Sequence, residues 1–400
     1  MSTASTETLR RPNTRDENWR YANLRALERI PFESGTVVHG ELDPATVPQR
    51  LASRRVVLVD GIYNASLSDE LPAGVSVKTA DSTAVPNDQS NSIDRYFSLL
   101  NGRRRTETLS MQLAAGTRLE LEILCIARGL GHPAITIDLA TNASLNLIER
   151  HIALTDETLS TATHCATNLA VTIKLAAQAK LDLLRWHRLS GKTQHVETLD
   201  IRLGDGAYFE LVQLTSARRA SDTASSRSTA FVRHEGAGDL RWNAATLAEG
   251  QQNHDAYVRI EHAAPGAATR QMFRGIATGR GRIGFNGHML VTAQASNARS
   301  EQSLKSLLAG GEAEANVRPQ LEIYTDAVTA THGATVGKLD PDMLFYLLSR
   351  GLSPATAESL LKWAFISDVL ARLGDRAARH EIEAALVEQL PGAVAARGEM

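Results

Sequence analysis

The strongest constraint on the fold is a period-two pattern of apolar residues that runs from about residue 105 to 335 and is interrupted by small residues. Alternation at every second position is typical of strands that bury one face. The interruptions are typical of tight corners and recur roughly every 27 to 36 residues, which favours a coiled β-solenoid with stacked turns. A β-sandwich also alternates and turns often, so it remains the alternative. The strand runs are TRLELEILCIA (117–127), AITIDLATNASLNLIERHIAL (134–154), NLAVTIKLAAQAKLDLLRW (168–186) and TLDIRLGDGAYFELVQL (198–214), and the corners are TNAS (141–144), AQAK (177–180), GDGA (204–207), EGAG (235–238) and GGEAEA (310–315).

The pattern differs before this stretch. Residues 1–95 are expected to form a helical region and a linker, because apolar residues within ENWRYANLRALERI (17–30) recur near a helical spacing. The segment VPNDQSNS (85–92) is rich in turn-forming residues and predicts a boundary. The expected solenoid core is residues 96–335.

Residues 336–400 are expected to form a C-terminal helical domain. Asp340 and Ser353 are each followed by proline, which is typical of a capped helix start, and Ile382 and Leu386 mark a third helix. The middle helix is apolar over a wide arc, which predicts that it is covered on two sides, either by neighbouring helices or by a partner protein. The arc includes Leu360, Trp363, Phe365 and Ile366.

Composition narrows the possible environments. The chain has 43 Lys and Arg against 45 Asp and Glu, a formal charge of −2, which argues against non-specific nucleic-acid binding. Its two cysteines cannot form a disulfide framework, and they favour a reducing compartment. No apolar leader is present in the first fifteen residues, and no apolar run reaches the roughly 20 residues that span a bilayer. We therefore expect a cytoplasmic protein with no membrane association.

Two glycine motifs and the histidines are the candidates for chemical sites. GRGRIG (279–284) is followed by another strand pattern rather than a helix, so it predicts a turn between strands. SGKT (190–193) lacks the glycine that begins a P-loop, because Trp186 stands there. The twelve histidines look scattered and show no metal-ligand spacing. His332, within THGATVGKLD (331–340), stands at the junction of the solenoid and the helices and is a candidate imidazole ligand.

The stretch around His332 resembles a known family. PQLEIYTDAVTATHGATVGKLDPDMLFYLLSRGLS (319–353) is similar to the C-terminal signature of the SufB/SufD family of iron–sulfur cluster assembly proteins. Supporting stretches are ENWRYANLRAL (17–27), HDAYVRIEHAAPGAATRQMFRGI (254–276), GFNGHMLV (284–291) and SEQSLKSLLAGGEAEANVRPQLEI (300–323). The resemblance covers nearly the whole chain, and its length and Trp-Arg-Tyr opening are more typical of the SufD branch.

This resemblance implies a mostly β protein: a right-handed parallel β-helix flanked by N- and C-terminal helical regions. It also implies a non-catalytic scaffold subunit that pairs with a SufB-like paralogue and binds a SufC-like ATPase. An iron–sulfur cluster would contact the complex transiently, no cofactor would be stably bound by this chain alone, and a flavin is suggested by the family only. The wide apolar arc, with Leu360, Trp363, Phe365 and Ile366, then has the ATPase as its candidate partner.

One departure from the family pattern affects the site. Ala330 stands where the family motif has cysteine, whereas His332 keeps the histidine position. A thiolate is the soft ligand that iron prefers, and alanine cannot replace it. His332 would either bind iron at an interface with SufB or only pack there. Cys125 and Cys165 are expected to be buried strand residues.

Two other functions remain as alternatives. Ala330 favours a homodimeric structural platform that never contacts a cluster. A β-helix carbohydrate-active enzyme would need acidic residues that converge on one solenoid face, and the acidic residues are spread along the chain.

Overall fold

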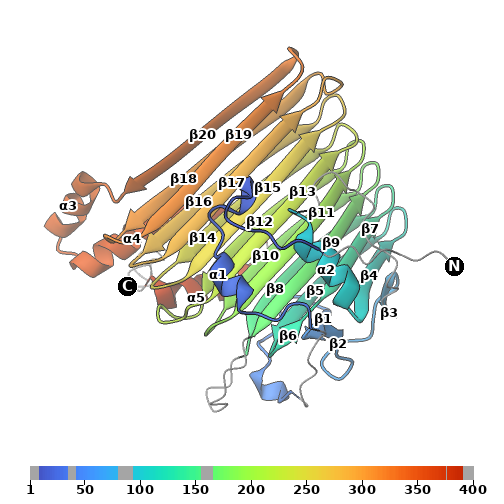
Figure 1. Ribbon diagram of the computed structural model, residues 1–400, viewed down its shortest axis with the longest axis horizontal. Helices are drawn as coiled ribbons and strands as arrows, with labels where there is room; N and C mark the ends of the chain where they lie inside the picture. The colour runs from blue at the N-terminus through green and yellow to red at the C-terminus, as the bar shows by residue number, and fades with distance from the viewer. Residues whose placement is uncertain (1–8, 35–41, 80–92, 155–164, 375, 391–400) are drawn as a thin grey trace.

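The chain coils so that successive strands alternate between two facing sheets (Figure 1). The computed structural model describes residues 9–34, 42–79, 93–154, 165–374 and 376–390. In spatial order, the first sheet, sheet A, contains β2 (Ile62–Tyr63), β1 (Arg55–Val59), β5 (Arg118–Ala127), β8 (Ser144–Ala153), β10 (Lys180–Leu189), β12 (Tyr208–Ala217), β14 (Asp239–Ala248), β16 (Ala268–Thr278), β18 (Ala298–Ala309) and β20 (Val328–Lys338). Sheet B contains β19 (Glu314–Ile323), β17 (Arg282–Val291), β15 (Asn253–His262), β13 (Ser225–His234), β11 (Gln194–Leu203), β9 (Ala166–Leu175), β7 (Ala134–Leu139), β4 (Glu107–Leu113) and β3 (Val75–Thr79), with β6 (Leu130–Gly131) beside β9.

The strand pairing decides between the two architectures left open by the sequence. Each strand of the main stack pairs in parallel with the strand after next, one coil further along, as β8 does with β10. Antiparallel pairing occurs only where the stack begins, between β1 and β2 and between β3 and β4, among the described strands. The β-solenoid is therefore confirmed, and the sandwich is excluded.

The corners explain why small or flexible residues recur. Asn142, Gln178 and Gly206 lie between a sheet B strand and the next sheet A strand, each with φ near +60°. At Gly206, a Cβ atom would also meet the side chain of Gln178 in the preceding coil. Two further corners of this kind, at Gly266 and Asn297, were missed by the sequence analysis. GGEAEA (310–315) is a corner as expected, but it lies at the opposite edge, between β18 and β19.

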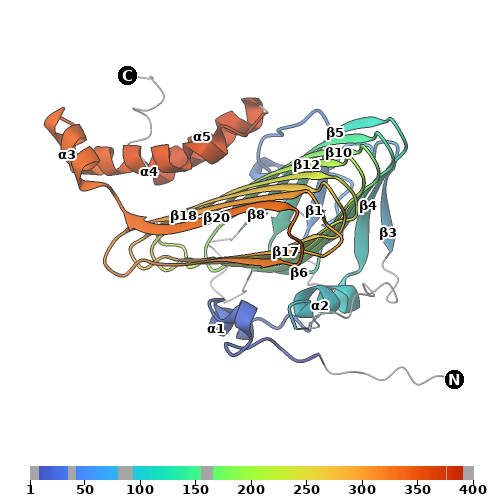
Figure 2. The same cartoon turned by 90° about the horizontal axis from the view of Figure 1, so that it is seen from above.

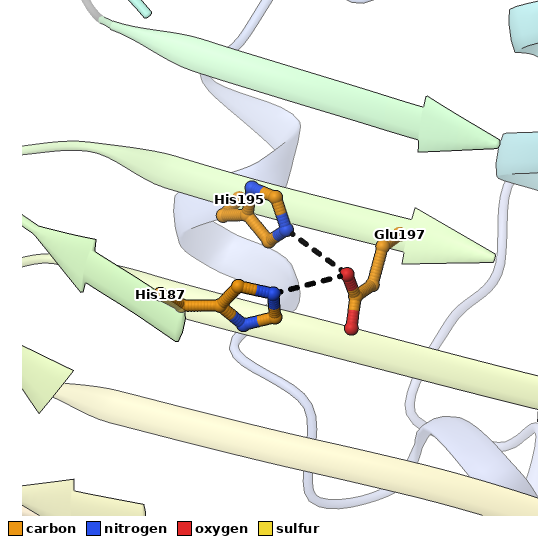
Figure 3. A group of neighbouring side chains, drawn as sticks. All are labelled: His187, His195 and Glu197. Atoms are coloured by element: carbon orange, nitrogen blue, oxygen red, sulfur yellow. Dashed lines mark hydrogen bonds and ion pairs between the residues drawn. The ribbon is translucent and has the colours of Figure 1, made fainter. Parts of the chain in front are cut away.

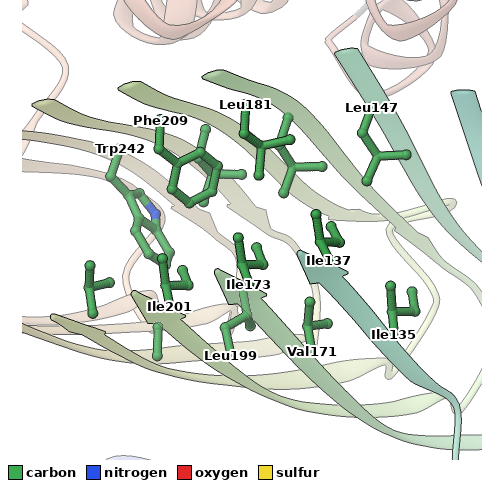
Figure 4. Close-up of a cluster of buried hydrophobic side chains, with 14 of the residues drawn as sticks. Ile135, Ile137, Leu147, Val171, Ile173, Leu181, Leu199, Ile201, Phe209 and Trp242 are labelled. Carbon is green, nitrogen blue, oxygen red and sulfur yellow. The ribbon is translucent and has the colours of Figure 1, made fainter. Parts of the chain in front are cut away.

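The apolar half of each strand alternation points between the sheets. Leu147 and Leu181 from sheet A face Ile173 and Ile201 from sheet B, and Phe209 and Trp242 continue the same layer (Figure 4). All six side chains are almost fully buried. Successive side chains of a strand point to opposite faces, so a strand with one buried face has an apolar residue at every second position, whereas a helix does not.

Helices cover the outer face of each sheet (Figure 2). Helices α4 (Pro354–Leu370) and α5 (Arg376–Gln389) lie on sheet A, whereas α1 (Leu24–Glu28) and α2 (Tyr96–Arg104) lie on sheet B; α3 (Pro341–Ser349) projects beyond the last coil. Asp340 and Ser353 cap α3 and α4 as expected. The N-terminal pattern instead forms a short 3-10 turn, Glu17–Trp19, and the separate helix α1, and Tyr21 is 43% exposed.

The C-terminal helices run back along the stack and are tied to several coils. Asp368 in α4 accepts from Arg274 in β16 at 3.2 Å. Glu381 lies 3.7 Å from Arg150 in β8, and Glu388 in α5 lies 3.0 Å from Arg188 in β10. The end of the chain therefore contacts coils that form its middle.

The remaining expectations about the fold have mixed outcomes. Strands β1 to β3 fall within residues 1–95, which were expected to be helical and linker, and VPNDQSNS (85–92) lies outside the described residues. GRGRIG begins with the turn between β16 and β17, as expected, and SGKT forms the turn between β10 and β11. Among the described helices, none is long and apolar enough to cross a membrane.

Candidate functional site

The last coil of the solenoid is open. In the described part of the chain, β19 pairs only with β17 and β20 only with β18, and no residue from 308 to 356 is buried. Yet most inward-facing positions of this coil remain apolar, including Ile323 at 39% and Val336 at 46% exposure. An apolar strand face with an unpaired edge is a surface built to receive more strands.

His332 lies on this open coil. Its register partner in β18 is Gln302, which is buried and donates to Gln271 of the preceding coil at 2.9 Å. His332 is thus the exposed end of an inward-facing polar row. Ala330 is in register with Ser300 on the same face, so the position of the family cysteine lies next to the imidazole.

Helix α3 extends the exposed apolar surface. Met343, Phe345 and Tyr346 are 58%, 72% and 56% exposed. Large exposed apolar side chains gathered on one short element mark an interaction surface. Sequence reasoning did not single them out, although the run MLFYLL was the signal.

The four apolar residues named on α4 are not equivalent. Ile366 is fully buried against the outer face of sheet A, so the expectation that it contacts a partner does not fit this structure. Trp363 and Phe365 are partly buried against the same cluster, and Leu360 is partly exposed. The wide apolar arc is therefore covered in part by the chain's own sheet.

A second concentration of polar groups lies inside the solenoid. The strand alternation places Glu149 and His151 in β8, and Arg185 and His187 in β10, on the same inward face as the core leucines that precede them. In register, Arg185 stands beside Glu149 and His187 beside His151. His195 and Glu197 of β11 approach them from sheet B, and all six side chains are buried.

The prediction that the histidines are scattered was therefore wrong for three of them. The motifs L-x-L-x-E-x-H (145–151), L-x-L-x-R-x-H (181–187) and H-x-E-x-L (195–199) were the signal. In each motif, the alternate positions that hold buried leucines also hold charged residues and histidines, so these polar side chains point into the solenoid as well.

The geometry centres on the Glu197 carboxylate (Figure 3). Its Oε2 lies 3.2 Å from His195 Nε2 and 3.4 Å from His187 Nε2. Arg185 Nη2 lies 2.9 Å from the same oxygen and 2.7 Å from Glu149 Oε1, so the guanidinium bridges both carboxylates. His187 Nδ1 lies 3.3 Å from the Thr215 hydroxyl.

Burial and charge set the protonation of this cluster. Burial raises the pKa of Glu149, but Arg185 and His151 outweigh it and lower that pKa to about 2. Burial likewise opposes ionisation of Glu197, yet Arg185 holds its pKa well below the usual range. Burial lowers the pKa of His151 and His187, in spite of the nearby carboxylates. The carboxylates are therefore ionised, and both imidazoles are neutral, at neutral pH.

The two cysteines are buried, as expected. Burial raises the pKa of the Cys125 thiol well above its usual range and that of Cys165 to about 12. Neither forms the reactive thiolate that sulfur transfer needs.

Comparisons with known proteins agree with this architecture. Residues 125–365 match the family "SUF system FeS cluster assembly, SufBD core domain", which is more than half of the chain. The chain is 27% identical over 393 residues to the iron–sulfur cluster assembly protein SufD of Escherichia coli, covering 95% of this chain and 90% of that protein. It is 26% identical over 391 residues to an iron–sulfur cluster assembly SufBD family protein of Synechocystis sp., covering 90% of this chain and 84% of that one. The chain therefore belongs to the SufBD family of the SUF system for iron–sulfur cluster assembly.

Proposed function

We propose that this chain is a SufD-like scaffold subunit of the cytoplasm, which pairs with a SufB-like solenoid through its open coil and binds a SufC-like ATPase through its C-terminal helices. The proposal depends most on one observation: residues 308–356 include no buried residue, although the inward face of the coil is apolar. The subunit itself catalyses nothing, and the cluster is its cargo.

A second solenoid is the partner whose chemistry fits best. Strands β19 and β20 present free edges of two facing sheets, so a partner with the same cross-section extends both ladders at once. Such a partner also covers Ile323 and Val336 with its own inward-facing residues. A related chain provides that geometry, and a globular protein without an open coil does not.

A charge placed in the open coil should disrupt this pairing. We expect Val336→Asp to weaken binding of the SufB-like paralogue at least tenfold, because the interface would bury an unpaired carboxylate. Thr335→Asp is the matched control, since Thr335 is the exposed neighbour on the opposite face of the same strand. Both variants are co-expressed with the paralogue and the ATPase, and the affinity of the purified pair is measured. Equal binding by the two variants would contradict the proposed interface.

His332 provides a separate test of a role in cluster chemistry. We expect His332→Ala to leave the complex assembled, since the side chain is exposed, but to lower the iron and sulfide recovered with it several-fold. The measurement is iron and sulfide per complex after purification without oxygen. An unchanged yield would favour the second candidate, a purely structural platform, for which Ala330 at the family cysteine position is the supporting observation.

Helix α3 and the exposed part of α4 are the surface proposed for the ATPase. Phe345 is 72% exposed, and Leu360 and Trp363 lie partly exposed on α4. The ATPase thus has an apolar surface to bind that does not overlap the open strand edges.

A further inference from the structure

The buried polar cluster gathers several metal-ligating side chains at one place inside the solenoid. Its carboxylates, Glu149 and Glu197, and its imidazoles, His151, His187 and His195, are all buried. Arg185 contacts both carboxylates. Imidazole nitrogens and carboxylate oxygens that converge away from solvent are a possible set of metal ligands.

Two buried nitrogen atoms of this cluster, Nη1 of Arg185 and Nε2 of His187, have no hydrogen bond within the described part of the chain. The Nε2 atom of His187 is the one that faces a carboxylate, with Glu197 Oε2 at 3.4 Å. Its other ring nitrogen, Nδ1, is placed by the Thr215 hydroxyl. An imidazole held through one nitrogen, with the other directed at a carboxylate, has the arrangement of a metal ligand with its supporting hydrogen bond.

The spacing of the donor atoms fits a small cation. One ligand atom from each of His187, His195 and Glu197 lies within 4.8 Å of the other two. Ligands held at 2.0–2.2 Å from a tetrahedral ion are separated by about 3.3 Å. The two nitrogen-to-oxygen distances, 3.2 and 3.4 Å, already match that separation.

We propose that His187, His195 and Glu197 form a resident binding site for a divalent first-row transition metal, Zn²⁺ or Fe²⁺, inside the solenoid. Two imidazoles and one carboxylate are the donor set that both ions accept. A cavity of about 10 Å³, lined in part by His151 and His195, lies beside the site and is about the size of one water molecule. The site belongs to β10 and β11, and is therefore separate from His332 on the open coil.

Arg185 is compatible with this site. Arg185 Nη2 donates to Glu197 Oε2, the oxygen that faces the two imidazoles, and so orients that carboxylate. The same Nη2 also donates to Glu149, so the positive charge of Arg185 is shared between the two carboxylates. A carboxylate oxygen has two lone pairs, and can accept from the guanidinium with one and bind the metal with the other.

The test measures metal in the full-length chain, purified without chelators and then reconstituted with Zn²⁺ alone. We expect about one equivalent of tightly held metal, a higher Tm with Zn²⁺ than after chelation, and an affinity roughly 100-fold weaker in His187→Gln. His262→Gln is the matched control, because His262 is also a buried strand histidine but has no carboxylate contact among its described hydrogen bonds. It should bind as the unmodified chain does.

A milder variant keeps the proposal testable if His187→Gln does not fold. Thr215→Val removes only the hydroxyl near His187 Nδ1 and should weaken Zn²⁺ binding roughly tenfold. The proposal is overturned if Zn²⁺ leaves the Tm unchanged. It is also overturned if His187→Gln and His262→Gln bind Zn²⁺ equally, since the metal would then be held elsewhere.

Discussion

Replacing Arg185 by methionine should lower the free energy of unfolding by about 3–5 kcal/mol at neutral pH. The guanidinium is fully buried and bridges Glu149 and Glu197, so its removal leaves two carboxylates inside the solenoid without their cation. Methionine keeps most of the volume and excludes a large cavity as the cause. The measurement is chemical denaturation of the purified chain, followed by fluorescence of its four tryptophans.

The pH dependence separates this explanation from general damage. In the unmodified chain the pKa of Glu149 is lowered to about 2, so the stability that it contributes is present at neutral pH and is lost as pH falls towards 2. Without Arg185, burial should outweigh the histidine contacts that also favour ionisation, and should raise the pKa values of both carboxylates above their unfolded values. The variant should therefore regain stability as pH falls, and the difference between the two proteins should narrow between pH 7.5 and 5.

A surface arginine provides the comparison. Arg202 forms an ion pair with Glu235 in which the side chains are 56% and 42% exposed. Arg202→Met should cost no more than about 1 kcal/mol, with no recovery at lower pH. If Arg185→Met behaves in the same way, the buried carboxylates are not held by this guanidinium.

Replacing Ile366 by aspartate should detach the C-terminal helices from the solenoid. Ile366 is fully buried and packs against the outer face of sheet A. The variant would therefore bury an unpaired charge, at a cost of about 3–5 kcal/mol. Because each coil is stabilised mainly by its neighbours, the solenoid should stay folded while the helices separate. Limited proteolysis should then release fragments cut near residues 339–353, and the SufC-like ATPase should no longer be retained.

Ala364→Asp tests whether the charge alone is responsible. Ala364 is exposed two residues away on the same helix, so its replacement should leave the helix docked and the protease sensitivity nearly unchanged. Equal protease sensitivity in the two variants would show that Ile366 does not anchor the helix.

The solenoid could be predicted from the sequence because its two requirements, alternating burial along each strand and a tight corner between strands, both depend on residues close together in the chain. Period-two burial is visible in every run from TRLELEIL onward, and corners need small or left-handed residues such as Asn142 and Gly206. The corners at Gly266 and Asn297 were missed although small residues flank both, in AAPGAA (263–268) and ASNA (295–298), so the signal was present in the sequence. The N-terminal helix was overestimated, since Trp19 and Leu24 are buried by sheet B from two separate short elements.

The candidate sites were only partly visible for a different reason. His332 was located through a resemblance, and its exposure on an open coil depends on where the stack ends. The cluster around Glu197 requires knowing that β10 turns directly into β11, which brings the rings of His187 and His195 to within 4.7 Å of one another. Alternation indicates which way a side chain points, but not which coil it meets.

The position of α4 and α5 on the outer face of sheet A also affects the order in which the chain folds during synthesis. A solenoid can assemble coil by coil as the chain leaves the ribosome, because each coil needs only the one before it. Helices α4 and α5, which cover β8, β10 and β16 from outside through Glu381, Glu388 and Asp368, are made after the coils that they cover. During translation the outer face of sheet A, with Leu184 and Trp186, therefore stays uncovered until α4 and α5 emerge, so the nascent chain exposes an apolar surface that favours aggregation over that interval.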